Sequence, residues 1–121
     1  MPYTFDIHPE DKLIISHLSG ELTPELMIAL RKDVISDSRF SPAYSAIDDV
    51  TGVSVISITN EQLRQMASVS VLQPGARHAL VVANDLQYGL ARMYASYAEF
   101  SEYEIQVCRS IDEAYDWVIK K

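Results

Sequence analysis

Two adjacent carboxylates, Asp48 and Asp49, stand in the stretch IDDVTGVSVISITNEQL, which runs from Ile47 to Leu63. Paired carboxylates are a common basis of acid/base catalysis, because one can hold a proton while the other is ionised. Successive residues of a strand point to opposite faces of a sheet, so two neighbours in an extended segment cannot share a proton. We therefore expect one of them to brace the following turn, and we predict no catalytic residue.

The same stretch carries two hydroxyl groups, Ser57 and Thr59, near a predicted helix start. Both are weak candidates for phosphorylation. The sequence T-N-E-Q is a capping box that pairs Thr59 with Gln62, and this pairing is a sufficient reason for the threonine. We predict that Thr59 caps the helix.

Open parallel sheets bind ligands beyond the carboxyl ends of their strands. The residues expected there include Gly20 and Glu21, and Arg109 and Ser110, all of which also fit turns or helix caps. No metal or cofactor is expected, since the three histidines share no metal-ligand spacing. The candidate ligand or partner surface comprises Asp49, Thr51, Ser57, Thr59, Asn84, Asp85, Tyr88 and Arg92.

The composition excludes several classes of function. The 121 residues carry a formal net charge of −7, which disfavours binding to nucleic acid or to an anionic membrane surface. No apolar run approaches the ~20 residues needed to cross a bilayer, and no export signal is evident, so a cytoplasmic protein is expected. Cys108 is the single cysteine and is expected to be a buried structural thiol.

The chain predicts one α/β domain over residues 1–121, with elements in the order ββαβαβαβα. Alternation in YTFDIH and KLIISHL predicts an antiparallel hairpin, with a third strand in AYSAIDDV. Later strands are expected in RHALVVAN and EIQVCRS. Helices are expected after Thr23, after Thr59, from Asn84 or Asp85, and after Ser110. The sheet should hold four parallel strands with right-handed β-α crossovers, plus an antiparallel N-terminal edge strand.

The element order, the length and the segment IDDVTGVSVIS together resemble the STAS domain, the module shared by anti-sigma factor antagonists and the cytoplasmic tails of sulfate transporters. Asp49, Thr51, Gly52 and Val53 echo the family's apolar-Asp-x-Ser-Gly-Val run. The antagonists are phosphorylated on a serine at the following helix start. The corresponding positions here are Ser57, Ile58 and Thr59, and Ile58 occupies the usual phosphoacceptor position. YGLARMY and RSIDEAYDWV resemble stand-alone bacterial members of unassigned role.

Three functions are consistent with this resemblance and with the residues. The first is a non-catalytic regulatory or protein-interaction module that binds an unidentified protein partner. The second is a small apolar-ligand or lipid-binding protein, and the third is an enzyme that uses Asp49 and Asp85 around a divalent cation. The helix that starts at Asn84 or Asp85 is expected to place Leu86, Leu90, Met93, Tyr94 and Tyr97 on its apolar side. Its segment from Tyr88 to Tyr97 offers two apolar faces, through Tyr88, Tyr94 and Tyr97 with Met93 and Arg92, and the face that does not meet the sheet could form a homodimer contact.

Overall fold

The computed structural model describes residues 2–69, 72–98 and 103–119, and the strands and helices follow one another in the predicted order. The strands are β1 (Tyr3–His8), β2 (Leu13–Leu22), β3 (Ser45–Ile56), β4 (Arg77–Val81) and β5 (Glu104–Cys108). The helices are α1 (Pro24–Ser36), α2 (Asn60–Ala67), α3 (Asp85–Tyr97) and α4 (Ile111–Ile119).

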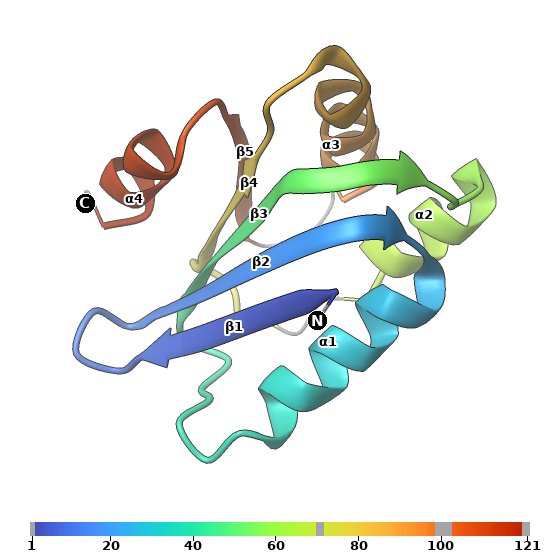
Figure 1. Cartoon of the computed structure of the whole chain (residues 1–121). Helices are drawn as coiled ribbons and strands as arrows, with labels where there is room; N and C mark the ends of the chain where they lie inside the picture. Colours follow the sequence, from blue (N-terminus) through green and yellow to red (C-terminus); the bar gives the residue numbers. More distant parts are fainter. Residues whose placement is uncertain (1, 70–71, 99–102, 120–121) are drawn as a thin grey trace.

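The five strands form one sheet in the order β1-β2-β3-β4-β5. β1 is antiparallel to β2, and the other neighbours are parallel, as predicted. The strands are added in one direction across the sheet, and α1, α2 and α3 lie together on one face while α4 lies on the other (Figure 1). Right-handed crossovers place linking helices on a common face in this way.

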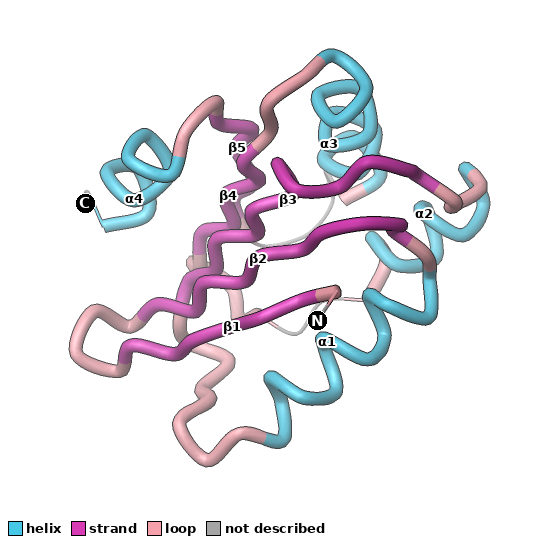
Figure 2. The backbone as a smooth tube through the Cα atoms, viewed as in Figure 1, coloured by secondary structure: helices cyan, strands magenta, loops and turns pink. Residues whose placement is uncertain are grey.

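The two faces of the sheet, whose strands are the magenta segments in Figure 2, have separate hydrophobic cores. The larger core lies between the sheet and α1–α3 and includes Leu18, Leu30 and Leu80. The smaller core lies beneath α4 and includes Leu13 and Ile47. Burial of both faces explains why β4 is almost continuously apolar.

Side chains cap the helix starts as the sequence predicted. The Thr23 hydroxyl accepts a hydrogen bond from the Leu26 N–H. Thr59 forms the complete capping box with Gln62, and Asn84, rather than Asp85, caps α3. These side chains satisfy backbone N–H groups that have no partner within the helix.

The structure corrects the prediction of a turn after Val50, because β3 continues to Ile56. β2 is also longer than expected and contains Gly20 and Glu21, so β3 has a hydrogen-bonding partner along its whole length. Register shifts in the β2–β3 pairing place both Val50 and Val53 in the buried interior although they are three residues apart. Thr51 and Gly52 are therefore strand residues and not turn residues.

The close approach of β2 to β3 also explains Gly52. A Cβ atom at this position would lie 3.0 Å from the Leu18 carbonyl oxygen and 3.1 Å from the Ser19 Cβ. A glycine avoids this crowding at the irregular part of the pairing.

One detail of the helices differs from the sequence-based prediction. Leu86 is 63% exposed, so it does not belong to the buried side of α3, which is formed by Gln87, Ala91 and Tyr94. The sequence alone left open whether the stretch SVSVL extends α2 or belongs to a loop. The helix ends at Ala67 with Ser68 as its C-cap, and residues 70–71 of this stretch lie outside the described part of the chain.

Candidate ligand-binding site

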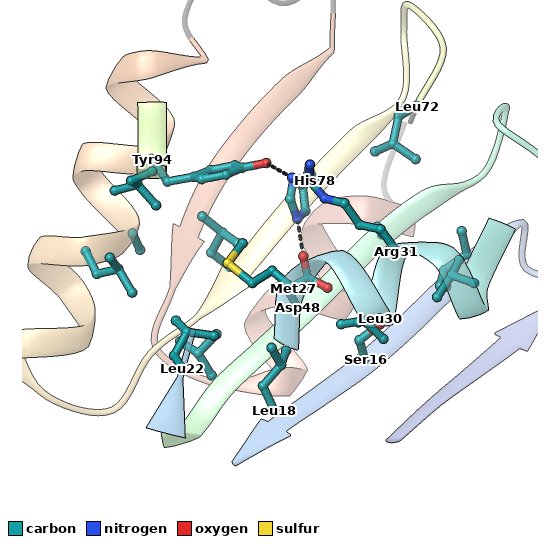
Figure 3. Close-up of a pocket in the computed structure, with 18 of the residues that line it drawn as sticks. Ser16, Leu18, Leu22, Met27, Leu30, Arg31, Asp48, Leu72, His78 and Tyr94 are labelled. Atoms are coloured by element: carbon teal, nitrogen blue, oxygen red, sulfur yellow. Dashed lines mark hydrogen bonds and ion pairs between the residues drawn. The ribbon is translucent and has the colours of Figure 1, made fainter. Parts of the chain in front are cut away.

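A cavity of about 120 Å³ lies between the sheet and the helices α1, α2 and α3. Most of its wall is apolar. Strand residues form its floor, and helix residues form its sides (Figure 3). The apolar lining includes Leu18, Leu22, Met27, Leu30, Val50, Leu63, Leu80, Leu90 and Ala91.

The floor of the cavity contains a contact between a histidine and a carboxylate on two neighbouring strands. His78 Nε2 lies 2.6 Å from Asp48 Oδ2, and the His78 side chain is almost fully buried. Ser16, which is paired in register with Asp48, is also buried on this face. Alternation along β2, β3 and β4 brings these three polar residues to the same side as Leu18, Val50 and Leu80.

A second polar contact reaches the cavity from the helices. The Arg31 Nη2 group of α1 donates a hydrogen bond of 2.9 Å to the Tyr94 hydroxyl of α3. Burial raises the pKa of Tyr94, against the opposing charge of Arg31, so the phenol stays protonated at neutral pH. In Figure 3 the Tyr94 hydroxyl, Arg31 and His78 converge on one region, with Asp48 next to His78.

Arg31 differs from most of the other described arginines in its partners. Its second contact is a long one of 3.5 Å from Nη1 to the Val69 carbonyl oxygen. No carboxylate of the described residues forms an ion pair with Arg31. In contrast, Arg39 pairs with two carboxylates, and Arg64 and Arg77 each pair with one. The guanidinium group of Arg31 therefore lines the cavity, and both of its hydrogen-bond acceptors among the described residues are neutral.

Asp49 points to the opposite face of the sheet, as the alternation of a strand predicts. Its carboxylate accepts hydrogen bonds from the Thr51 backbone N–H and hydroxyl, and lies 2.8 Å from His17 Nδ1. Partial burial acts to raise the pKa of Asp49, but the contacts with Thr51 and His17 together lower it below its ordinary value. Asp48 and Asp49 therefore cannot act as one acid/base pair.

The lowered pKa of Asp49 predicts a pH-dependent contribution to stability. The ionised carboxylate stabilises the fold above the unfolded pKa of about 3.9, and this contribution is lost as the pH falls through the folded value. Asp49→Asn should lower the free energy of unfolding by about 1 kcal/mol at pH 7. Urea denaturation between pH 7 and pH 2 should show this difference shrinking on acidification. A constant difference over the whole range would contradict the assignment.

The other predicted site residues lie outside the cavity and have local partners. The Ser57 hydroxyl donates a 2.6 Å hydrogen bond to Glu21, while Thr59 and Asn84 cap their helices. Asp85 is exposed in the first turn of α3. The remaining two are Tyr88, whose ring lies 4.4 Å from the Arg109 guanidinium carbon, and Arg92, which is exposed.

The predicted dimer contact on α3 needs one correction. Tyr94 is 6% exposed and faces the cavity, so it is not available to a second copy of the chain. Leu86, in contrast, is exposed on this helix. The helix packs through its Tyr94 side because Gln87, Ala91 and Tyr94 recur at helical spacing.

Several features bear on the classes of function considered from the sequence. No group of three or more His, Cys, Asp or Glu side chains within the described ranges is arranged to hold a metal ion. None of the described helices has the length and apolar character needed to cross a bilayer. Cys108 is fully buried and unpaired, and burial raises the pKa of its thiol, which fits a structural role.

Sequence reasoning missed the cavity residues Ser16, Arg31, Asp48 and His78 as a group. A usable signal was present, because each strand residue of this group interrupts an otherwise apolar strand face. Arg31 had no such signal, since an arginine in an amphipathic helix is usually a solvent-facing residue.

Together these observations define a class: a single α/β domain with a mixed sheet and an amphipathic cavity under its three linking helices. No protein-family model matches the chain, and no curated protein matches it in sequence. Among solved structures it is similar to an uncharacterised protein of the DUF3478 family from Shewanella loihica PV-4, described as having a SpoIIAA-like fold. The TM-score is 0.62 at 18% identity, covering 96% of this chain and 93% of that one. The chain thus has the SpoIIAA-like, STAS-like fold that the sequence indicated.

Proposed function

We propose that the protein is a non-catalytic binding domain that holds a small molecule with an apolar body in the cavity between the sheet and α1–α3. The observation that carries this proposal is the cavity itself, which is apolar over most of its wall and has a few polar groups converging at one place. Sites for small molecules commonly combine an apolar lining with a small number of placed polar groups.

The size of the cavity limits the ligand. An engineered apolar cavity of about 150 Å³ is large enough to bind benzene. At about 120 Å³ the cavity here suits a compact body of similar size rather than a long lipid chain. The sequence alone was consistent with either a small apolar ligand or a lipid, and the cavity volume favours the small ligand.

The polar groups favour binding over catalysis. A Ser–His relay requires the histidine to contact the serine hydroxyl, and none of the hydrogen bonds between described residues joins Ser16 to His78. The recorded partner of His78 Nε2 is Asp48. The cavity therefore offers hydrogen-bonding and charged groups without an activated nucleophile.

Filling the cavity should weaken binding while the fold is retained. Ala91 is buried in the cavity wall, and Ala91→Leu would extend a larger side chain into the space. NMR titration of the wild type with toluene should show saturable shifts of cavity residues. The variant should bind toluene at least about tenfold more weakly, a loss of ~1.4 kcal/mol.

A matched control uses an alanine on the outer surface of a helix. Ala29 is exposed on α1 and does not line the cavity, so Ala29→Leu should bind toluene as the wild type does. Thermal unfolding establishes that each variant is folded. If toluene, benzamide and benzoate all fail to give saturable shifts in the wild type, the proposed function is wrong.

A regulatory or protein-interaction role, including self-association, is the second candidate. Its support is the STAS-like fold together with the exposed Leu86 on α3. It ranks lower because an isolated exposed apolar residue is common on protein surfaces. Sedimentation velocity tests self-association. A monomer at every concentration up to the millimolar range would contradict self-association.

A further inference from the structure

We infer that the molecule held in the cavity is a monocarboxylic acid whose carboxylate binds the Arg31 guanidinium. This inference rests on the proposed function, and it adds the chemical class of the ligand. It depends on three features of the cavity: the charge of Arg31, which pairs with no carboxylate of the described residues, the hydrogen bond that Tyr94 makes with Arg31, and the carboxylate of Asp48 nearby.

The first feature is the incomplete hydrogen bonding of Arg31. A guanidinium group has several N–H donors in a planar fork, which match the two oxygens of a carboxylate. Here two contacts are recorded, to the Tyr94 hydroxyl and, at 3.5 Å, to the Val69 carbonyl, and both acceptors are neutral. A partly buried cation of this kind is stabilised by an anion, and none of the described residues supplies one.

The second feature is the position of the guanidinium. Tyr94 is 6% exposed on α3, and its hydroxyl accepts the 2.9 Å hydrogen bond from Arg31 across the cavity. The contact holds the guanidinium in the cavity wall, where Figure 3 shows it beside Tyr94 and His78. Tyr94 is therefore a positioning residue, and Arg31 is the residue expected to contact the ligand.

The third feature limits the charge of the ligand. Arg31 is the one lysine or arginine among the described residues that line the cavity, and the Asp48 carboxylate lies in the same wall, paired with His78. A ligand with a single negative charge balances Arg31. A phosphate dianion would meet repulsion from Asp48 without a second cation to offset it.

The apolar wall accounts for the rest of the molecule. The cavity volume of about 120 Å³ suits a benzene-sized body, so benzoate is a suitable probe of this class. Benzamide has the same ring and a planar head of similar size, but it is neutral. The pair separates recognition of charge from filling of the cavity.

The test compares the two probes in four proteins by NMR titration. The wild type should bind benzoate at least about tenfold more tightly than benzamide, because the charge-assisted hydrogen bonds are absent with the amide. Arg31→Met should lose this preference and still bind benzamide. Arg31→Lys should retain part of it, and Arg92→Met, which removes an exposed arginine outside the cavity, should behave as the wild type.

Equal binding of benzoate and benzamide to the wild type would overturn the inference and leave the proposed function standing. Binding of neither probe, nor of toluene, would remove the proposed function and the inference with it. Tighter binding of phenyl phosphate than of benzoate would overturn the assignment to a monocarboxylate. If Arg31→Met does not fold, the probe preference of Arg31→Lys decides: a preference unchanged from the wild type, at low and at high salt, would also contradict the inference.

Discussion

Replacement of Gln87 by leucine is expected to lower the free energy of unfolding by about 3 kcal/mol. Gln87 is 1% exposed, and its side chain makes three hydrogen bonds to backbone groups. Its Nε2 donates to the carbonyl oxygens of Thr51 and Val53, at 3.2 Å and 2.9 Å. Its Oε1 accepts from the Ala83 N–H at 2.7 Å. Leucine has a similar volume but makes none of these three hydrogen bonds, and the contact with the Val53 carbonyl is fully buried.

The lengths of the strands explain why this glutamine matters. The pairing of β3 with β4 ends at Asp49 and Val81, whereas β3 continues to Ile56. The Thr51 and Val53 carbonyls therefore lie beyond the last residue pair with β4, and Gln87 of α3 supplies the donors. The side chain joins the start of α3 to the outer half of β3.

Chemical denaturation with urea measures the effect of Gln87→Leu. Gln65→Leu on the exposed surface of α2 is the matched control and should change the free energy of unfolding by less than about 0.5 kcal/mol. Native-state hydrogen exchange should also show faster exchange near the start of α3 in the Gln87 variant. A loss of stability no larger than that of the control would show that the three hydrogen bonds are unimportant.

Ile47→Ala is expected to destabilise the fold by about 2–5 kcal/mol, through the lost transfer free energy and the cavity left behind. Ile47 is fully buried on β3, in the core between the sheet and α4. The same core contains other buried strand residues, together with Ala114 and Val118 of α4. The effect should appear as a lower urea midpoint with an unchanged slope.

An isoleucine at the surface provides the control for this variant. Ile35 is 47% exposed on α1, so Ile35→Ala should cost much less. Equal losses of unfolding free energy in the two variants would mean that burial of Ile47 beneath α4 does not contribute to stability as expected. A large loss for Ile35→Ala alone would point to an unrecognised contact on the outer surface of α1.

The fold was predictable because local signals agree along most of the chain. Thr23, Thr59 and Asn84 mark helix starts by chemistry that needs no knowledge of the tertiary structure. The extension of β3 to Ile56 was not predictable in the same way. It depends on β2 reaching Leu22 beside it, and the glycine in TGV favours a turn when the sequence is considered alone.

The cavity was less predictable than the fold. Ser16, Asp48 and His78 share a face only once the parallel register of three strands is known. Arg31 and Tyr94 are 63 residues apart in the chain, and their contact depends on how α1 and α3 pack on the sheet. Capping residues, in contrast, act within one turn, which is why the sequence alone identifies Thr59 and Asn84 as helix caps.

The opposite orientations of Asp48 and Asp49 have a consequence for the alignment of the strands. Asp48 contacts His78 of β4 on one face, and Asp49 contacts His17 of β2 on the other. A slip of β3 by one residue would exchange the faces and turn each carboxylate away from its histidine. A slip in one of the two directions would also put Ile47 in the place of Asp48 in the wall of the cavity. The two carboxylate–histidine contacts thus favour the observed register of β3 with β2 and β4. Apolar residues alone would distinguish this register from a shifted one less strongly.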